Sequence, residues 1–132
     1  YCITTMVDFG TKILGTQNAT MKSLSEFKDE FSDSRTFSFL HELETLLNNG
    51  LIKGGDLNNA IVYVDKEISS ATMENLKKAF GKDEITVKPN GILDNLTLHY
   101  PNEAARHKLL DVVGDLSLIG TKDQWECSVF SF

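Results

Sequence analysis

The sequence predicts an α+β fold: a two-layer sandwich with helices packed on one face of a small mixed or antiparallel sheet. In several segments apolar residues recur at three- and four-residue steps, which is typical of helices. In others, β-branched and aromatic residues gather in short runs typical of strands. The two kinds of segment do not alternate strictly, and this favours α+β over a parallel arrangement. With 132 residues, the chain is long enough for one domain with a core.

The first half of the chain begins with a run rich in β-branched residues, which indicates a strand. Two helical patterns follow, and Gly50 stands where a left-handed residue would end the second helix. A polar, glycine-bearing connection over 51–59 leads to the second half. The expected elements are a strand over 1–9, an extended piece over 12–14, and helices over 23–31 and 36–49.

The second half contains a compact apolar run and two further helical patterns. Ser69 and Ser70 would begin one helix and Gly81 would end it, and Asn102 is a plausible N-cap for the last and longest helix. Turn residues at 89–91 predict a hairpin. The expected elements are strands over 60–64, 84–87 and 93–100, and helices over 73–80 and from 102 to about 120, with no clear pattern over 121–132.

Charge and cysteine usage narrow the class of protein. The net charge is −6 and the pI about 5.0, which argues against nucleic acid as a partner because such binding needs clustered Lys and Arg. No apolar run approaches the length of a transmembrane segment, and the residue pattern leads us to expect no signal peptide. Cys2 and Cys127 have no metal-binding spacing and are expected to be free thiols. A cytoplasmic location is therefore expected.

The last helix carries a candidate metal site. His107, Asp111 and Asp115 follow one another at four-residue steps, so in a helix they lie roughly 40° apart around the axis and about 6 Å apart along it. An imidazole and a carboxylate one turn apart can bind one cation, and zinc takes such nitrogen and oxygen ligands. We expect both groups to point away from the core. The spacing alone also fits an ordinary solvated helix face.

Three blocks together resemble a known family. Their order and spacing are similar to the second domain of UDP-3-O-acyl-N-acetylglucosamine deacetylase, the zinc enzyme that commits the cell to lipid A synthesis. The resemblance covers 1–120 and leaves 121–132 as a divergent tail or an end foreign to the family. The blocks are SRTFSF at 34–39, GLIKGGDLNNAIV at 50–62 and RHKLLDVVGDLSLIG at 106–120.

The resemblance implies a Zn²⁺ cofactor and a hydrolytic mechanism. Two of the family's zinc ligands match His107 and Asp111. The third ligand is a histidine of the first domain, next to a glutamate that acts as general base. This chain contains neither, so the first domain is an expected partner that completes the site.

The same resemblance assigns catalytic and substrate-binding roles to four more residues. Thr36 would offer its hydroxyl to the oxyanion, and Phe37 would pack against the substrate. Lys108 would lie near the polar groups of the substrate, a UDP-linked acylated amino sugar. Asp115 would orient the histidine that acts as general acid. The segment 55–64 would line the passage for the acyl chain.

The sequence departs from the family pattern in ways that bear on activity. No histidine occurs in 121–132, where the family carries its general acid, and His41 and His99 match no family motif. We therefore expect half of a zinc-dependent deacetylase that is inactive as an isolated domain. The alternative is a non-catalytic α+β binding module that retains the family fold. The helix at 73–80 resembles the form in which the deacetylase is fused to a hydroxyacyl dehydratase.

Overall fold

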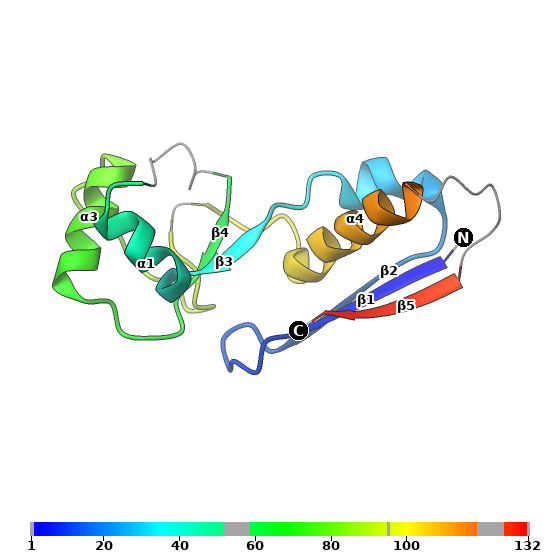
Figure 1. The fold of residues 1–132 in the computed structure, drawn as a ribbon, viewed down its shortest axis with the longest axis horizontal. Coiled ribbons are helices and arrows are strands. Elements are labelled where there is room, and N and C mark those ends of the chain that lie inside the picture. Colours follow the sequence, from blue (N-terminus) through cyan, green and yellow to red (C-terminus); the bar gives the residue numbers. More distant parts are fainter. Residues whose placement is uncertain (1, 52–58, 95, 119–125, 132) are drawn as a thin grey trace. The chain divides into compact units, whose positions relative to one another are not determined.

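The computed structural model describes residues 2–51, 59–94, 96–118 and 126–131. The chain divides into two compact units, each with helices packed against a small sheet (Figure 1), which confirms the α+β class. We refer to them as unit 1 and unit 2. Unit 1 comprises Tyr1–Gly10, Leu14–Arg35 and His99–Phe132, and unit 2 comprises Thr11–Ile13 and Thr36–Leu98.

The sheet of unit 1 has three strands. They are β1 (Cys2–Asp8), β2 (Thr16–Met21) and β5 (Glu126–Ser131). β1 lies in the middle, antiparallel to β2 and parallel to β5, so the sheet is mixed as expected. Alternate residues of β1 are buried, because successive side chains of a strand point to opposite faces.

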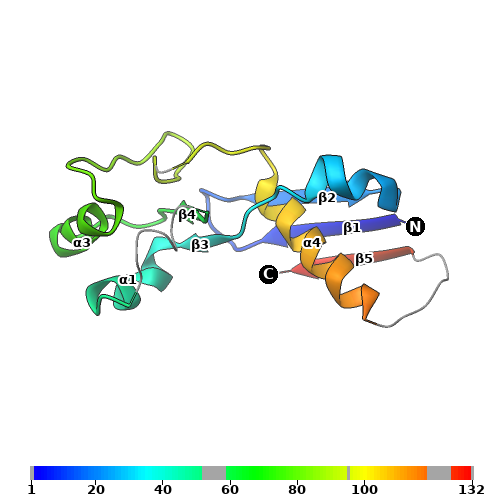
Figure 2. The same ribbon diagram turned by 90° about the horizontal axis from the view of Figure 1, so that it is seen from above.

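One long helix covers this sheet. It is α4 (Glu103–Ser117), which packs on β1 and β2, with the short helical turns η1 (Leu24–Glu26) and η2 (Phe27–Phe31) on the same side of the sheet (Figures 1 and 2). Ile3, Val7 and Leu109 are fully buried in the layer between them. The buried Thr5 hydroxyl donates a hydrogen bond to the Ala105 carbonyl at 2.9 Å, which ties the strand to the helix.

Unit 2 is built on two parallel strands and two helices. The strands are β3 (Phe37–Phe39) and β4 (Ile61–Tyr63), and the helices are α1 (Leu40–Asn48) and α3 (Ser70–Phe80). Aliphatic side chains from both helices, from β4 and from the segment that follows α3 form its core. They are Leu40, Leu47, Val62, Val64, Leu76, Ile85 and Leu93.

Local sequence explains the limits of α3 and of the turn that follows. The Ser69 side chain accepts a hydrogen bond from the Thr72 amide, and Gly81 ends α3 in the left-handed conformation, as predicted. The Gly91 amide donates to the Lys88 carbonyl, and Gly91 has φ +81°. A Cβ atom at Gly91 would collide with the Ile13 side chain, so this position requires glycine for two reasons.

Several expected elements differ in the structure. The 12–14 piece is a turn, and the strand follows it as β2. The start of the expected 36–49 helix is β3, because these residues pair with β4 instead. Among the described residues, the expected strands over 84–87 and 93–100 are reduced to one antiparallel bridge between Val87 and Leu93, and a further bridge joins Ile92 to Tyr63. There are also two small sheets rather than one.

The remaining expectations agree with the structure in type. The strands at the start of the chain and at 60–64 form as β1 and β4, and the helices over 73–80 and from 102 form as α3 and α4. The 23–31 segment is helical, as a 3-10 turn followed by a π-helical turn. Most of the 51–59 connection lies outside the described residues, as do 121–125 and 132 of the tail, whereas 126–131, for which no element was expected, form β5. Among the described helices, none combines the length and hydropathy needed to cross a membrane.

Candidate functional site

The predicted ligand pair lies together on α4 in unit 1. His107 Nε2 is 3.8 Å from Asp111 Oδ1, one helical turn away. The His107 side chain is 23% exposed and that of Asp111 is 51% exposed, so neither is buried in the aliphatic layer beneath the helix. The expectation that both groups share one accessible face of the helix is met.

The orientation of the His107 ring is fixed by a backbone group. Its Nδ1 atom is 3.1 Å from the Ser34 carbonyl oxygen. A carbonyl can only accept, so Nδ1 must carry the proton and donate it. In the neutral imidazole this leaves the lone pair on Nε2, the atom that faces Asp111. Metal-binding histidines are typically held in this way by a hydrogen bond from the other ring nitrogen.

These two donors fit one side of a zinc site. Two tetrahedral ligands with bonds of about 2.0–2.2 Å lie about 3.4 Å apart, so a separation of 3.8 Å requires only a small side-chain rotation. Within the described part of the chain, no group of three or more His, Cys, Asp and Glu side chains could hold a metal ion. A zinc ion bound at His107 and Asp111 would therefore need a ligand from outside this set.

Lys108 and Asp115 lie on the same helix. The Lys108 ammonium is 3.8 Å from Asp111 Oδ2, and its side chain is 34% exposed. Asp115 is exposed one turn beyond Asp111. The arrangement places a positive charge next to the pair His107 and Asp111, where it could contact an anionic or polar substrate group.

Thr36 and Phe37 belong to unit 2. Thr36 is exposed, and its carbonyl accepts a hydrogen bond from the Ile61 amide at 2.9 Å, at the start of the pairing of β3 with β4. Phe37 is half-buried, and its ring meets the Tyr63 ring edge-on at 6.1 Å between centroids. Their roles beside the residues of α4 stay predictions.

The structure adds a buried charged group that the sequence did not reveal. Glu103, at the start of α4, is fully buried and accepts four hydrogen bonds. Arg35 supplies three of them, from its amide at 3.2 Å and from its guanidinium at 2.9 and 3.2 Å, and the His99 amide supplies the fourth at 2.9 Å. No local sequence pattern signals this ion pair, because its partners lie 68 positions apart.

These contacts determine the acidity of Glu103. Burial alone would raise the pKa of this carboxyl group, but the hydrogen bonds from Arg35 and from the His99 amide outweigh it and hold the pKa below its ordinary value. Glu103 is therefore a charged carboxylate at neutral pH. Arg35 and His99 are the residues of unit 1 that precede and follow the segment Thr36–Leu98 of unit 2, so Glu103 binds unit 1 at both ends of that segment.

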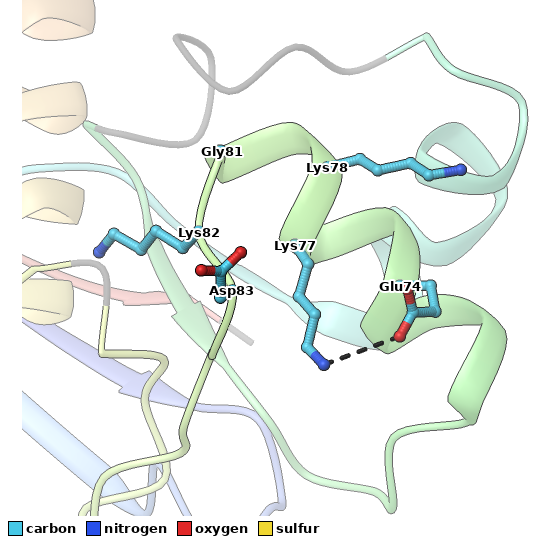
Figure 3. Close-up of a pocket in the computed structure, with 6 residues that line it drawn as sticks. All are labelled: Glu74, Lys77, Lys78, Gly81, Lys82 and Asp83. Atoms are coloured by element: carbon cyan, nitrogen blue, oxygen red, sulfur yellow. Dashed lines mark ion pairs between the residues drawn. The ribbon is translucent and has the colours of Figure 1, made fainter.

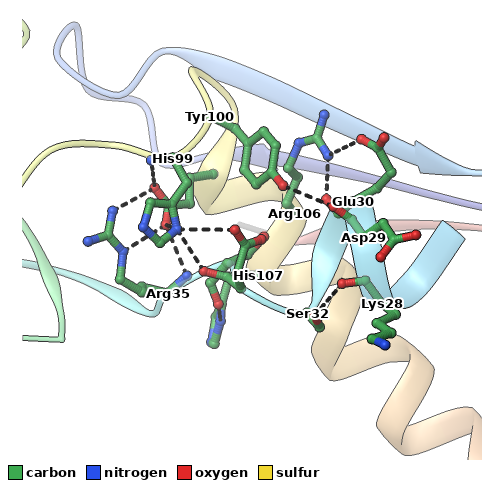
Figure 4. Close-up of polar contacts among 12 residues, drawn as sticks. Lys28, Asp29, Glu30, Ser32, Arg35, His99, Tyr100, Arg106 and His107 are labelled. Carbon is green, nitrogen blue, oxygen red and sulfur yellow. Dashed lines mark hydrogen bonds and ion pairs between the residues drawn. The ribbon is translucent and has the colours of Figure 1, made fainter.

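The second arginine holds η2 against α4. The Arg106 guanidinium lies over the Tyr100 ring at 4.0 Å and over the Phe31 ring at 5.1 Å, measured to the centroids. It also donates to the Glu30 carbonyl and lies 3.6 Å from the Glu30 carboxylate (Figure 4). These contacts make Arg106 a packing residue rather than a substrate ligand.

The two other histidines also have partners. His41 Nδ1 is 2.9 Å from Asp65 Oδ1, and its ring stacks on Phe39. His99 Nδ1 donates to the Asp33 carbonyl at 3.0 Å, a contact within unit 1. Neither adds a ligand to the pair on α4.

A shallow hollow of about 440 Å³ lies at the end of α3 in unit 2 (Figure 3). Three lysines contribute to it, but their side chains point in different directions, and Lys77 pairs with Glu74 at 3.7 Å. The amines do not converge on one point, so the hollow does not form an anion site. Its lining residues are Glu74, Lys77, Lys78, Gly81, Lys82 and Asp83.

Comparisons with known proteins identify relatives across most of the chain. A family model described as LpxC, UDP-3-O-acyl N-acetylglycosamine deacetylase, matches residues 1–78 and 71–129. The bifunctional enzyme LpxC/FabZ of Chlorobaculum tepidum is 46% identical over 121 residues, which is 89% of this chain and 26% of that protein. The corresponding enzyme of Bacteroides thetaiotaomicron is 43% identical over 91% of this chain and 26% of its own length.

A relative that carries only the deacetylase name is also similar. The UDP-3-O-acyl-N-acetylglucosamine deacetylase of Trichormus variabilis is 36% identical over 86% of this chain and 33% of that protein. The chain thus spans about a quarter to a third of the length of these relatives.

Proposed function

Because this chain belongs to the family of UDP-3-O-acyl-N-acetylglucosamine deacetylases, we propose that it forms one half of a zinc-dependent amide hydrolase. The substrate is a UDP-linked, 3-O-acylated N-acetylglucosamine, and the reaction removes its N-acetyl group in lipid A biosynthesis. The observation that carries the proposal is the ring of His107, held by the Ser34 carbonyl with Nε2 facing Asp111. This pair lies within the part of the chain that the family model matches.

The chain would contribute ligands and charge to the hydrolysis. Zinc, held by His107 and Asp111 together with a ligand from the other half of the enzyme, would activate water and polarise the acetyl carbonyl. Lys108 would place its ammonium beside the polar groups of the substrate. Water adds to the acetyl carbon, the C–N bond breaks, and acetate and the free amine are the products.

Residues of both units would assist this reaction. The Thr36 hydroxyl would donate a hydrogen bond to the oxyanion that develops on the acetyl oxygen. Phe37 would pack against the substrate. Asp115 would accept a hydrogen bond from a histidine contributed by another part of the enzyme, and so orient that histidine as general acid.

We propose that the chain alone does not catalyse deacetylation of the substrate. The third metal ligand, the general base and the general acid must come from elsewhere, because His41 and His99 are held by Asp65 and by the Asp33 carbonyl. The enzyme would act in the cytoplasm, where Cys2 stays a free thiol. The bifunctional names of the first relatives support a whole protein that also carries a hydroxyacyl dehydratase.

A chimera tests the proposed function with the chain intact. In it, this chain replaces the matching segment of the Chlorobaculum tepidum enzyme, to which it is 46% identical. Deacetylation of a UDP-3-O-acyl-N-acetylglucosamine is measured with zinc present. We expect turnover by the chimera and none by the chain alone.

Matched histidine variants then locate the chemistry. In the chimera, His107→Ala should reduce kcat/KM at least about 100-fold, more than the usual loss of a residue behind a metal ligand. His41→Ala, which removes a histidine from the surface of unit 2, should leave kcat/KM unchanged. Full activity of His107→Ala would refute the proposal. A folded chimera that binds the substrate without hydrolysing it would favour the binding-module alternative.

A further inference from the structure

We propose that Glu103 is a positioning residue for His107 and acts through the peptide group between Ser34 and Arg35. The inference rests on the proposed function, because it takes His107 to be a metal ligand. It assigns to a buried carboxylate, which touches neither metal nor substrate, the task of orienting the imidazole. No contact of Glu103 with Asp111 or Lys108 is needed.

The geometry joins the two side chains through one planar unit. The Arg35 amide donates to Glu103 Oε1 at 3.2 Å, and the Ser34 carbonyl accepts from His107 Nδ1 at 3.1 Å. This amide and this carbonyl belong to the same peptide bond, and they point in opposite directions because that bond is planar and trans. The carboxylate and the imidazole, one turn apart on α4, therefore hold the same peptide from its two ends.

The charge of Glu103 should strengthen the second hydrogen bond. A hydrogen bond from an amide to a carboxylate is stronger than one to a neutral acceptor, and hydrogen bonds in series polarise one another. The polarised Ser34 carbonyl becomes a better acceptor for the Nδ1 proton of His107. This arrangement is equivalent to the carboxylate–histidine–metal triad of many zinc proteins, with a peptide group inserted between carboxylate and ring.

The surroundings keep the carboxylate fixed. Glu103 is fully buried, and the Arg35 guanidinium and the His99 amide occupy its remaining acceptor positions. The side chain cannot rotate away from the Arg35 amide without leaving these donors unpaired inside the protein. Its effect on the peptide is therefore permanent rather than transient.

The first test uses the isosteric change Glu103→Gln in the intact chain. Nitrogen-15 NMR at about pH 8 reports which ring nitrogen of His107 carries the proton. We expect the Nδ1–H form in the unmodified chain and a shift toward the Nε2–H form in the variant. Glu26→Gln is the matched control, because Glu26 also accepts a backbone amide in unit 1, from Lys22 rather than from Arg35.

The second test measures zinc affinity in the chimera by competition with a chelator. Glu103→Gln should weaken zinc binding about tenfold, the lower end of the effect of residues behind a metal ligand, and Glu26→Gln should not change it. A folded Glu103→Gln protein with unchanged zinc affinity and an unchanged ring would overturn the inference. If Glu103 had only a structural role, Glu103→Gln would lower stability but would change neither the zinc affinity nor the ring nitrogen of His107 that carries the proton.

Two further outcomes keep the proposals separate. If His107→Ala leaves zinc affinity unchanged, the proposed function fails; if it abolishes tight binding while Glu103→Gln does not, only the present inference fails. If the Glu103→Gln variant does not fold, hydrogen exchange measured on the unmodified chain tests the inference instead. Its Arg35 amide and its His107 Nδ1 proton must exchange slowly with solvent, and rapid exchange of either would overturn the inference.

Discussion

Unit 1 and unit 2 are each stabilised internally by a different kind of interaction. Unit 1 combines an apolar layer with a buried charge, because Glu103 is enclosed with the Arg35 guanidinium and two backbone amides. Unit 2 relies on a cluster of aliphatic side chains around Leu76. In unit 2 the carboxylate of Glu42, which accepts the Phe39 amide at the start of α1, lies at the surface.

The difference teaches where precise geometry is required. Apolar packing tolerates changes of shape at moderate cost, whereas a buried carboxylate is stable only while every partner is in place. The unit with the polar network is also the unit that carries His107 and Asp111. The three experiments below test whether the two units respond differently.

The largest effect is expected for Glu103→Ala. Removing one partner of a buried ion pair costs about 3–5 kcal/mol, because Arg35 and the two amides lose their acceptor. Urea unfolding followed by amide hydrogen exchange should show lost protection in β1 of unit 1 before α3 of unit 2. The control Glu42→Ala removes an exposed cap of α1 and should cost about 1 kcal/mol or less. Equal losses for the two variants would contradict the comparison.

A smaller loss of stability, in unit 2 instead of unit 1, is expected for Leu76→Ala. Leu76 is fully buried in the cluster of unit 2, and its truncation should cost about 3 kcal/mol through lost burial and a cavity. Protection should fall in α3 and remain in β1. Leu46→Ala is the matched control because Leu46 is 41% exposed on α1 of the same unit, and little change is expected. Loss of protection in β1 would show that the units do not unfold separately.

The third prediction concerns the titration of Glu103. It should change stability least at neutral pH and should lower the stability of unit 1 selectively in acid. Its pKa is lower in the folded state than the ordinary 4.5, so its contribution is fully present above about pH 4.5 and is lost as the pH falls through the lower, folded value. Urea midpoints measured from about pH 6 down to about pH 3 should fall for unit 1. Glu103→Gln should remove this part of the pH dependence, and an unchanged slope would assign it to other carboxyl groups.

The sequence predicted the elements whose signals are local. β1 has β-branched residues, α3 has Ser69 and Gly81 at its ends, and α4 has a regular apolar stripe. β2 was missed because its residues are mostly polar, and only pairing with β1 makes them a strand. β5 was missed because its pairing partner β1 is more than a hundred residues away in the sequence.

The candidate site likewise combines local contacts, which the sequence predicts, with long-range contacts, which it does not. The approach of His107 and Asp111 follows from a four-residue step on a helix, and the sequence was sufficient to predict it. The hydrogen bond to the Ser34 carbonyl and the burial of Glu103 join residues about 70 positions apart. A glutamate in the first turn of a helix normally indicates a solvated end, so no local pattern could reveal that this one is enclosed.

The middle position of β1 has a practical consequence for shortened versions of the chain. Its backbone amides and carbonyls are shared between β2 and β5, and β5 lies close to the carboxyl end. A protein cut back before residue 126 would expose one whole side of β1 as an open edge, which neighbouring molecules could extend into intermolecular sheets. Solubility, rather than catalysis, would then be the first property to suffer from trimming.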